Sequence, residues 1–289
     1  MALDLEDLRE RIAAAGLNWR ADETPVSRRL DAGDGNLFGL AISPDDAQRA
    51  VSQADYTHRL FAAPRLPRRM DWRDHKGANW LSPVRDQGAC GACMAFATTA
   101  VLEARVRIAH ETPDLALELS TAHLFFCGTA AQGMTNACAK GWDFAPALKH
   151  LRDTGVGMER DFPYSGSNQK CAQIASMVKV MAWSMNSAQD MRKQAIAANG
   201  PVIAGMRVYE DFGYYKEGVY KHVAGDPRSL HAVAVVGYDD DEQAWIVRNS
   251  WNSDWGDGGY ALVAYGQCGL DSEFVFYDPE VIYRPEGFS

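Results

Sequence analysis

The stretch Gln87-Gly-Ala-Cys90-Gly-Ala-Cys93-Met-Ala-Phe96 is a glycine-containing turn that runs directly into an apolar, alanine-rich segment. No glycine or proline interrupts this segment before Pro113, so the pattern predicts a loop that leads into a helix, with Cys93 in its first turn. A thiol there lies at the positive end of the helix dipole and beside backbone N–H groups without helical partners, and both favour the thiolate. Cys93 is therefore a candidate nucleophile.

This motif alone leaves other interpretations of Cys93 open. Cysteine is among the most frequently buried residues, and a pair such as Cys90 and Cys93 is also typical of a zinc half-site or a redox pair. Two downstream residues favour the nucleophile: His231, followed by Ala-Val-Ala-Val-Val-Gly-Tyr238, and Asn249, in the stretch that continues Ser-Trp-Asn-Ser-Asp-Trp. They lie about 140 and 155 residues after Cys93, close to the spacing of the corresponding residues in papain and the cathepsins.

The chain resembles the papain-like cysteine peptidases from about Leu66 onward. The matching stretches are Met70-Asp-Trp72, residues 87–96, Leu119-Ser120, Gly141, Tyr209-Glu-Asp-Phe212, Tyr215-Lys-Glu-Gly-Val-Tyr220, His231, Asn249 and Cys268-Gly-Leu270. Residues 209–223 and 249–257 are most similar to the cathepsin B branch. The resemblance implies an α+β fold with two lobes and an active-site cleft between them. A helical lobe would carry Cys93, and an antiparallel β-barrel-like lobe would carry His231 and Asn249.

The periodicity of the sequence divides the chain in the same way. Helical patterns dominate from Trp72 to about Val178, and strand patterns dominate from about Lys179. We therefore expect an N-terminal prosegment over residues 1–65, a helical lobe over 66–178 and a β-rich lobe over 179–289.

Residues 1–65 precede the papain-like match. Leu5, Leu8 and Ile12 predict a short amphipathic helix, and Ser43-Pro44-Asp45-Asp46 is typical of a helix start. Leu37-Phe-Gly-Leu40 resembles the short propeptide of cathepsin B. We interpret the segment as an inhibitory prosegment, while a non-inhibitory extension that only adds core stays open. Residues 62–69, with three arginines and two prolines, predict an exposed linker and a processing site.

Composition limits the classes of partner. The chain has 289 residues, 47% of them hydrophobic and 23% charged, as in soluble globular proteins. A net charge of −9 argues against nucleic acid or an anionic membrane as partner. The first residues show no secretory signal, yet six cysteines predict an oxidised framework and an extracytoplasmic or secreted protein. These two expectations conflict, which leaves a removed signal or an unconventional export route open.

The resemblance also implies the cysteine pairing. Cys90 would pair with Cys138, and Cys127 with Cys171, which leaves Cys93 free. Cys268 matches a family cysteine whose usual partner is absent from residues 219–230, so we expect it to be unpaired. No histidine and cysteine set has zinc-site spacing, and we expect neither a metal nor another cofactor.

The resemblance assigns a role to each catalytic residue. Cys93 would attack the peptide carbonyl, His231 would take and return the proton, and Asn249 would orient the imidazole. Gln87 and the backbone N–H of Cys93 would stabilise the oxyanion. In the resting enzyme, Cys93 and His231 are expected to form a thiolate–imidazolium pair.

The resemblance further implies five substrate-binding residues: Gly141, Trp142, Leu230, Trp251 and Glu273. Trp251 would shield the bond between His231 and Asn249 from water. Glu273 would lie at the base of the pocket for the second residue before the cut and accept Arg or Lys alongside apolar side chains, unless it is a solvated surface residue. The chain departs from the family pattern at Met94 and Lys140.

The function implied is a cysteine endopeptidase made as a zymogen. Its partners would be protein or peptide substrates and its own prosegment. Residues 164–171 are too short to hold the histidine-bearing insertion on which cathepsin B's exopeptidase activity depends. Acyl or peptidyl transfer from the same thioester, and a catalytically weak peptide-binding protein, remain as alternatives.

Overall fold

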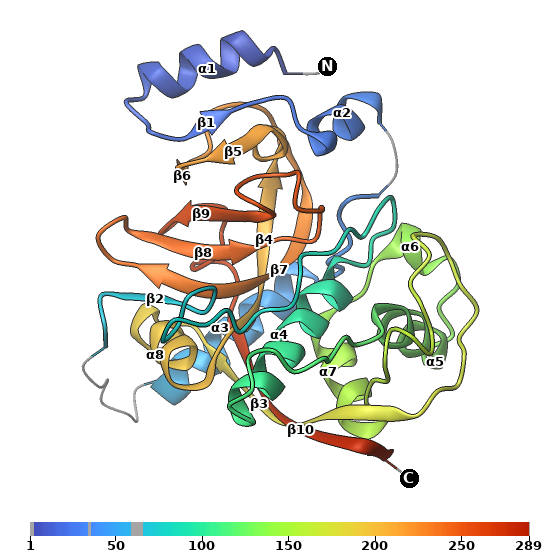
Figure 1. Cartoon of the computed structure of the whole chain (residues 1–289). Coiled ribbons are helices and arrows are strands. Elements are labelled where there is room, and N and C mark those ends of the chain that lie inside the picture. Colours follow the sequence, from blue (N-terminus) through green and yellow to red (C-terminus); the bar gives the residue numbers. More distant parts are fainter. Residues whose placement is uncertain (1–2, 34–35, 59–65, 289) are drawn as a thin grey trace.

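Helix α4 (Cys93–Ala109) packs against strand β7 (Pro227–Asp239) in the middle of the molecule, with the sheet on one side and shorter helices on the other (Figure 1). The computed structural model describes residues 3–33, 36–58 and 66–288. Residues 93–107 of α4 are all buried, as expected for a helix without a polar face. The N-terminus of α4, where Cys93 lies, is thereby fixed against the sheet.

The sheet has eight strands in the order β3-β10-β4-β7-β8-β9-β6, with β2 paired to β7. Neighbouring strands are antiparallel, except that β6 and β9 are parallel. The strands are β2 (Arg69–Asp71), β3 (Ser176–Asn186), β4 (Val202–Tyr209), β6 (Val219–Tyr220), β8 (Ala244–Arg248), β9 (Tyr260–Ala264) and β10 (Phe276–Phe288). Helix α8 (Gln189–Asn199) packs on β7.

The other side of α4 is helical. It contains a π-helical turn (His123–Cys127), α5 (Gly128–Ala131), α6 (Ala137–Lys140) and α7 (Phe144–Asp153). Two disulfides are formed as expected: Cys90–Cys138 joins the turn before α4 to α6, and Cys127–Cys171 joins the π-helical turn to a loop. In the chain-entropy model, a crosslink over a separation of 48 residues stabilises by about 4 kcal/mol. Cys93 and Cys268 are free and buried, in agreement with the expectation for both.

The described part of residues 1–58, here called the N-terminal segment, forms α1 (Leu5–Ala14), β1 (Arg20–Ala21), α2 (Pro25–Ala32) and α3 (Pro44–His58). The Asp4 carboxylate caps α1, and the Ser43 hydroxyl accepts from the backbone N–H of Asp46 in the first turn of α3. Strand β1 pairs with β5 (Tyr215–Glu217), and α3 packs against β3. Figure 1 shows α1 and α2 over one end of the sheet.

Several elements differ from the expectations. Helices α2 and α8 and the long strands β3 and β10 were not predicted, although Thr24 and Pro25 at the start of α2 are typical of a helix start. Strand β2 lies in the stretch assigned to the helical lobe but pairs with β7. The expected boundary at residue 178 falls inside β3. Residues 62–65 of the expected linker lie outside the described residues.

No helix among the described residues combines the length and the hydropathy needed to cross a bilayer.

Asp143 gives a pH-dependent test of this fold. It caps α7, and burial raises the pKa of its carboxyl to about 6, with repulsion from Asp46 of α3 adding to the shift. This pKa is above the ordinary value of 3.8. The free energy of unfolding therefore falls as the pH rises from about 4 through 6, because the carboxyl must then ionise while it is buried. We expect Asp143→Asn, which keeps a capping side chain, to match the parent at pH 4 and exceed its unfolding free energy by about 1 kcal/mol at pH 7.5.

Urea unfolding at both pH values, in a Cys93→Ala background, would measure this difference. Asp153→Asn is the control, because Asp153 pairs with Lys149 at the other end of α7 and its pKa is lowered. A gain for Asp143→Asn that is equal at both pH values would contradict the explanation.

Candidate active site

Cys93 lies where the turn after Gln87 enters α4. Its sulfur is buried and accepts from the backbone N–H of Ala232 on β7 at 3.5 Å. The backbone N–H of Gly39, from the N-terminal segment, also interacts with the sulfur. His231 directly precedes Ala232, so the fold brings the thiol and the imidazole to the same place.

His231 and Asn249 are joined by a hydrogen bond. His231 Nε2 lies 2.8 Å from Asn249 Oδ1, which also accepts from the backbone N–H of Ser250 at 2.8 Å. Because Asn249 Oδ1 is an acceptor, the neutral imidazole carries its proton on Nε2. Within the described residues, Nδ1 of His231 has no hydrogen-bond partner. The Trp251 ring covers the pair, with its centroid 4.8 Å from that of His231.

Gln87 is held in one orientation beside Cys93. Ser250 Oγ donates to Gln87 Oε1 at 2.6 Å, which fixes which end of the amide is the donor. Gln87 Nε2 donates to the carbonyl oxygens of Cys90 and Leu37 at 3.0 and 3.1 Å. A carbonyl of the N-terminal segment therefore already occupies the donor that was predicted to stabilise an oxyanion.

Burial keeps the candidate pair neutral in this covered state. Loss of water raises the pKa of the Cys93 thiol to about 11 and lowers the pKa of His231 to about 4, although the bond from Asn249 partly opposes the second shift. Between these values the thiol and the neutral imidazole are favoured. The thiolate–imidazolium pair expected from the sequence is thus not the favoured form while both groups are excluded from water.

The N-terminal segment crosses the site in an extended conformation. The backbone N–H of Trp142 donates to Gly39 O at 2.8 Å, and that of Ala41 donates to Trp142 O at 3.1 Å. The backbone N–H of Leu40 donates to Leu230 O at 3.4 Å. Residues 39–41 therefore form a short ladder with the body, as an added strand would.

Gly39 makes the closest approach to the body. A Cβ at this position would lie 1.9 Å from the carbonyl oxygen of Gly91, two residues before Cys93. A Cβ on Gly141 would lie 2.0 Å from the carbonyl oxygen of Gly39. Only glycine at both positions lets the two backbones come this close.

Four of the five expected substrate-binding residues contact this segment. They are Gly141, Trp142, Leu230 and Trp251, whose Nε1 donates to Leu37 O at 3.4 Å. Glu273 differs, because its carboxylate is bound by Arg207, with Nη2 and Oε2 2.5 Å apart. The expectation that Glu273 accepts Arg or Lys assumed a free carboxylate.

The comparisons with known proteins agree with this geometry. The papain family cysteine protease model matches residues 66–277. This chain belongs to the papain family of cysteine proteases. Pro-cathepsin H of Mus musculus is 37% identical over 229 residues, which are 74% of this chain and 66% of that protein. Cathepsin C of Schistosoma mansoni is 31% identical over 300 residues, covering 93% of this chain and 64% of its own length.

Solved structures share the fold of this papain-family chain. The proCathepsin B S9 from Trypanosoma congolense has a TM-score of 0.74 and 23% identity, covering 96% of this chain and 99% of its own. Digestive procathepsin L 3 of Tenebrio molitor has a TM-score of 0.73 and 20% identity, with 95% and 87% covered. The shared fold thus extends beyond the family match into the N-terminal segment. The resemblance to papain-like peptidases is confirmed, and a procathepsin B is among the structural neighbours.

Sequence reasoning missed three residues of this papain-family site. Ser250, which orients Gln87, stands between two recognised residues, and its hydroxyl is the signal that was overlooked. Gly39 is the glycine of the quoted Leu37–Leu40 stretch, but nothing in that stretch reveals its contact with Gly91. Arg207 gives no local signal, because its partner Glu273 is far away in the sequence.

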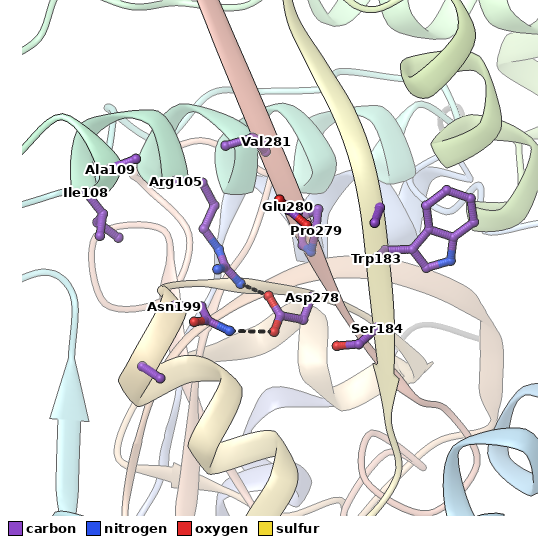
Figure 2. A pocket seen from close by; sticks show the side chains of 12 residues that line it. Arg105, Ile108, Ala109, Trp183, Ser184, Asn199, Asp278, Pro279, Glu280 and Val281 are labelled. Atoms are coloured by element: carbon purple, nitrogen blue, oxygen red, sulfur yellow. Dashed lines mark hydrogen bonds and ion pairs between the residues drawn. The ribbon is translucent and has the colours of Figure 1, made fainter. Parts of the chain in front are cut away.

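One cavity lies away from this site. It has a volume of about 630 Å³ and lies between α4, α8, β3 and β10 (Figure 2). Two of its polar side chains, Arg105 and Asn199, bind a third, Asp278. Among the described residues, no group of His, Cys, Asp and Glu could hold a metal ion.

Replacing Gly39 tests whether the segment covers Cys93. The backbone clash with Gly91 is expected to displace residues 36–41 in Gly39→Val, so the thiol becomes accessible. We expect iodoacetamide to label Cys93 at pH 7 at least about tenfold faster than in the wild type, measured by peptide mass mapping.

Ala13→Val is the matched control, since it enlarges an exposed side chain of the same segment. Equal labelling of Gly39→Val, Gly39→Ala and the wild type would show that the segment does not protect Cys93.

Proposed function

We propose that this protein is a cysteine endopeptidase made as a zymogen, with Cys93, His231 and Asn249 as its catalytic triad. The observation that carries the proposal is the main chain of residues 37–41, which is bound across the candidate triad. Gln87, Trp142 and Leu230 hold it by hydrogen bonds to backbone atoms. A site that binds an extended backbone in this way suits any peptide, whatever its sequence.

The proposed chemistry follows from the hydrogen bonds of the triad. Asn249 fixes the proton of His231 on Nε2, which leaves Nδ1 free to accept the proton of Cys93. The thiolate attacks the peptide carbonyl, and the imidazolium then gives its proton to the departing amine. A water molecule, deprotonated by the same imidazole, hydrolyses the thioester and releases the free thiol.

Gln87 and the backbone N–H of Cys93 are the proposed oxyanion donors. Gln87 Nε2 already donates to the carbonyl of Leu37, and it is preorganised because Ser250 holds the opposite end of the amide. Such donors stabilise the charge that develops on the carbonyl oxygen, and removing one costs about 2.7–4 kcal/mol in the barrier.

The proposed inhibitor is the prosegment, residues 1–65, followed by a helical lobe (66–178) and a β-rich lobe (179–289). The prosegment is also anchored away from the triad, on residues 213–220. Thr24 Oγ1 donates to Gly213 O at 2.6 Å, and the Tyr214 hydroxyl donates to the Asp31 carboxylate at 2.8 Å. Trp19 packs between Tyr215 and Tyr220. This anchoring argues against an extension that only adds core.

Two further parts of the proposal concern location and reaction type. The two disulfides suit an oxidising, extracytoplasmic compartment.

Hydrolysis is favoured over a pure binding role because the thiol, imidazole, amide and oxyanion donor are all present and oriented. Peptidyl transfer from the same thioester stays as the alternative, to be tested by adding an amine nucleophile and analysing the products.

Variants in a Gly39→Val background test the triad. We expect Cys93→Ala to abolish hydrolysis of a peptide amide, and Gln87→Ala to lower kcat about 100- to 1000-fold with little change in KM. Ser250→Ala should give a smaller loss of kcat, because it frees the Gln87 amide to rotate without removing it. Stopped-time hydrolysis assays would measure these values, and full activity of Gln87→Ala would refute the oxyanion role.

Peptides blocked at both ends test the endopeptidase assignment. An endopeptidase needs no terminal charge, so the Gly39→Val chain should cut an N-acetylated, C-amidated decapeptide within about threefold of the rate for the unblocked peptide. Mass spectrometry of early products would identify internal cuts. Loss of cleavage upon blocking one end would assign an exopeptidase instead.

A further inference from the structure

The Leu40 side chain of the prosegment occupies a side-chain pocket of the cleft. Its Cδ2 atom lies 2.8 Å from where a Cβ on Gly205 would be, and its backbone N–H is bound to Leu230 O. Beyond it, a cavity of about 220 Å³ is lined by Leu230, Phe274, Arg207 and Glu273 together with the start of α3. Leu40 thus marks where a substrate side chain would lie.

Arg207 and Glu273 are both fixed at this cavity by their backbones. Gly205 and Arg207 are two residues apart on β4 and so face the same side, and Arg207 pairs with Leu230 across to β7. The backbone N–H of Arg207 donates to Cys268 O at 2.7 Å, and that of Glu273 donates to Gly269 O at 2.8 Å. The guanidinium then binds the carboxylate through both Nη2 and Nε, at 2.5 and 3.4 Å.

We propose that Arg207 is a specificity-determining residue that cancels the charge of Glu273, so that this pocket selects uncharged, leucine-like side chains. The inference rests on the proposed peptidase function. A basic substrate side chain must compete with Arg207 for the only carboxylate that lines the cavity within the described residues. An acidic one must compete with Glu273 for Arg207. Each therefore loses part of its hydration at this partly exposed ion pair without gaining a free partner, while Leu230 and Phe274 offer apolar contact to a neutral side chain.

The prosegment supplies a test in the intact chain that does not depend on catalysis. All variants are made in a full-length Cys93→Ser protein. Leu40 is changed either to Arg or to Glu. Each of these two changes is made in three backgrounds: with Arg207 and Glu273 intact, with Arg207→Met, and with Glu273→Gln. Hydrogen exchange of the backbone amides of Ala41 and Trp142, which form the ladder with the prosegment, reports how often it undocks.

With Arg207 and Glu273 intact, Leu40→Arg and Leu40→Glu are expected to speed exchange by similar factors, because the pocket has no net charge. In Arg207→Met, the Leu40→Arg chain should exchange about fivefold more slowly than the Leu40→Glu chain. In Glu273→Gln, the order should reverse. Arg228→Met is the control, because Arg228 pairs with Glu210 outside this cavity, and it should leave the two chains equal.

The inference is overturned if Leu40→Arg already docks better than Leu40→Glu with both residues intact, or if Arg207→Met and Glu273→Gln fail to give opposite preferences. Cleavage of matched peptides with Leu, Arg or Glu at this position by the Gly39→Val chain is the second measurement. Absence of all cleavage would refute the peptidase function while the exchange result still decides the role of Arg207. If the peptides are cleaved but Arg207→Met does not raise the ratio of the cleavage rate of the Arg peptide to that of the Leu peptide, the inference is refuted and the peptidase function stands.

Discussion

The contact between the start of α4 and strand β7 is the constraint on which the rest of the structure depends, since it joins Cys93 to His231. Buried charges along α4 make this contact directional. Glu103 accepts from the backbone N–H of Leu119 and from Arg85, while Arg105 donates to Pro201 O and binds Asp278 on β10. A sliding of α4 by one residue would leave these charges without partners, at a cost of several kcal/mol for each. The hydrophobic contacts alone would tolerate such a shift more easily.

The same constraint explains why the cleft binds main chain rather than a particular sequence. The groups that face the cleft from both sides are backbone atoms of Trp142 and Leu230 and the amide of Gln87, and all of them bind backbone atoms of the prosegment. Such bonds are available to every peptide. Discrimination must therefore come from the few places where a side chain enters a pocket, and Leu40 is at one of them.

The disulfides were expected from the resemblance to papain-like peptidases, and both are present. The candidate catalytic residues followed from that resemblance together with the spacing of Cys93, His231 and Asn249, because the motif of Cys90 and Cys93 by itself left a zinc half-site or a redox pair open. The partner of Glu273 could not be predicted, because Arg207 is on another strand and its register with Leu230 follows from the whole sheet. The start of β3 at Ser176, before the expected boundary at residue 178, could not be predicted for a similar reason, since this strand is recognised by its pairing with β10.

The protonation states of Cys93 and His231 could not be predicted from the sequence either, and they bear on how the prosegment would inhibit. Helix position and backbone N–H groups favour a thiolate at Cys93, but they act against the desolvation that follows when residues 36–41 cover the site. Desolvation is the larger effect while the prosegment is docked. In the proposed zymogen, removal of the segment would open the cleft and return water to the two groups, which would favour the charged pair. A prosegment that blocks a nucleophile in this way needs no side chain aimed at the sulfur. Such a prosegment needs a backbone that fits closely against Gly91, and Gly39 allows this because it has no Cβ.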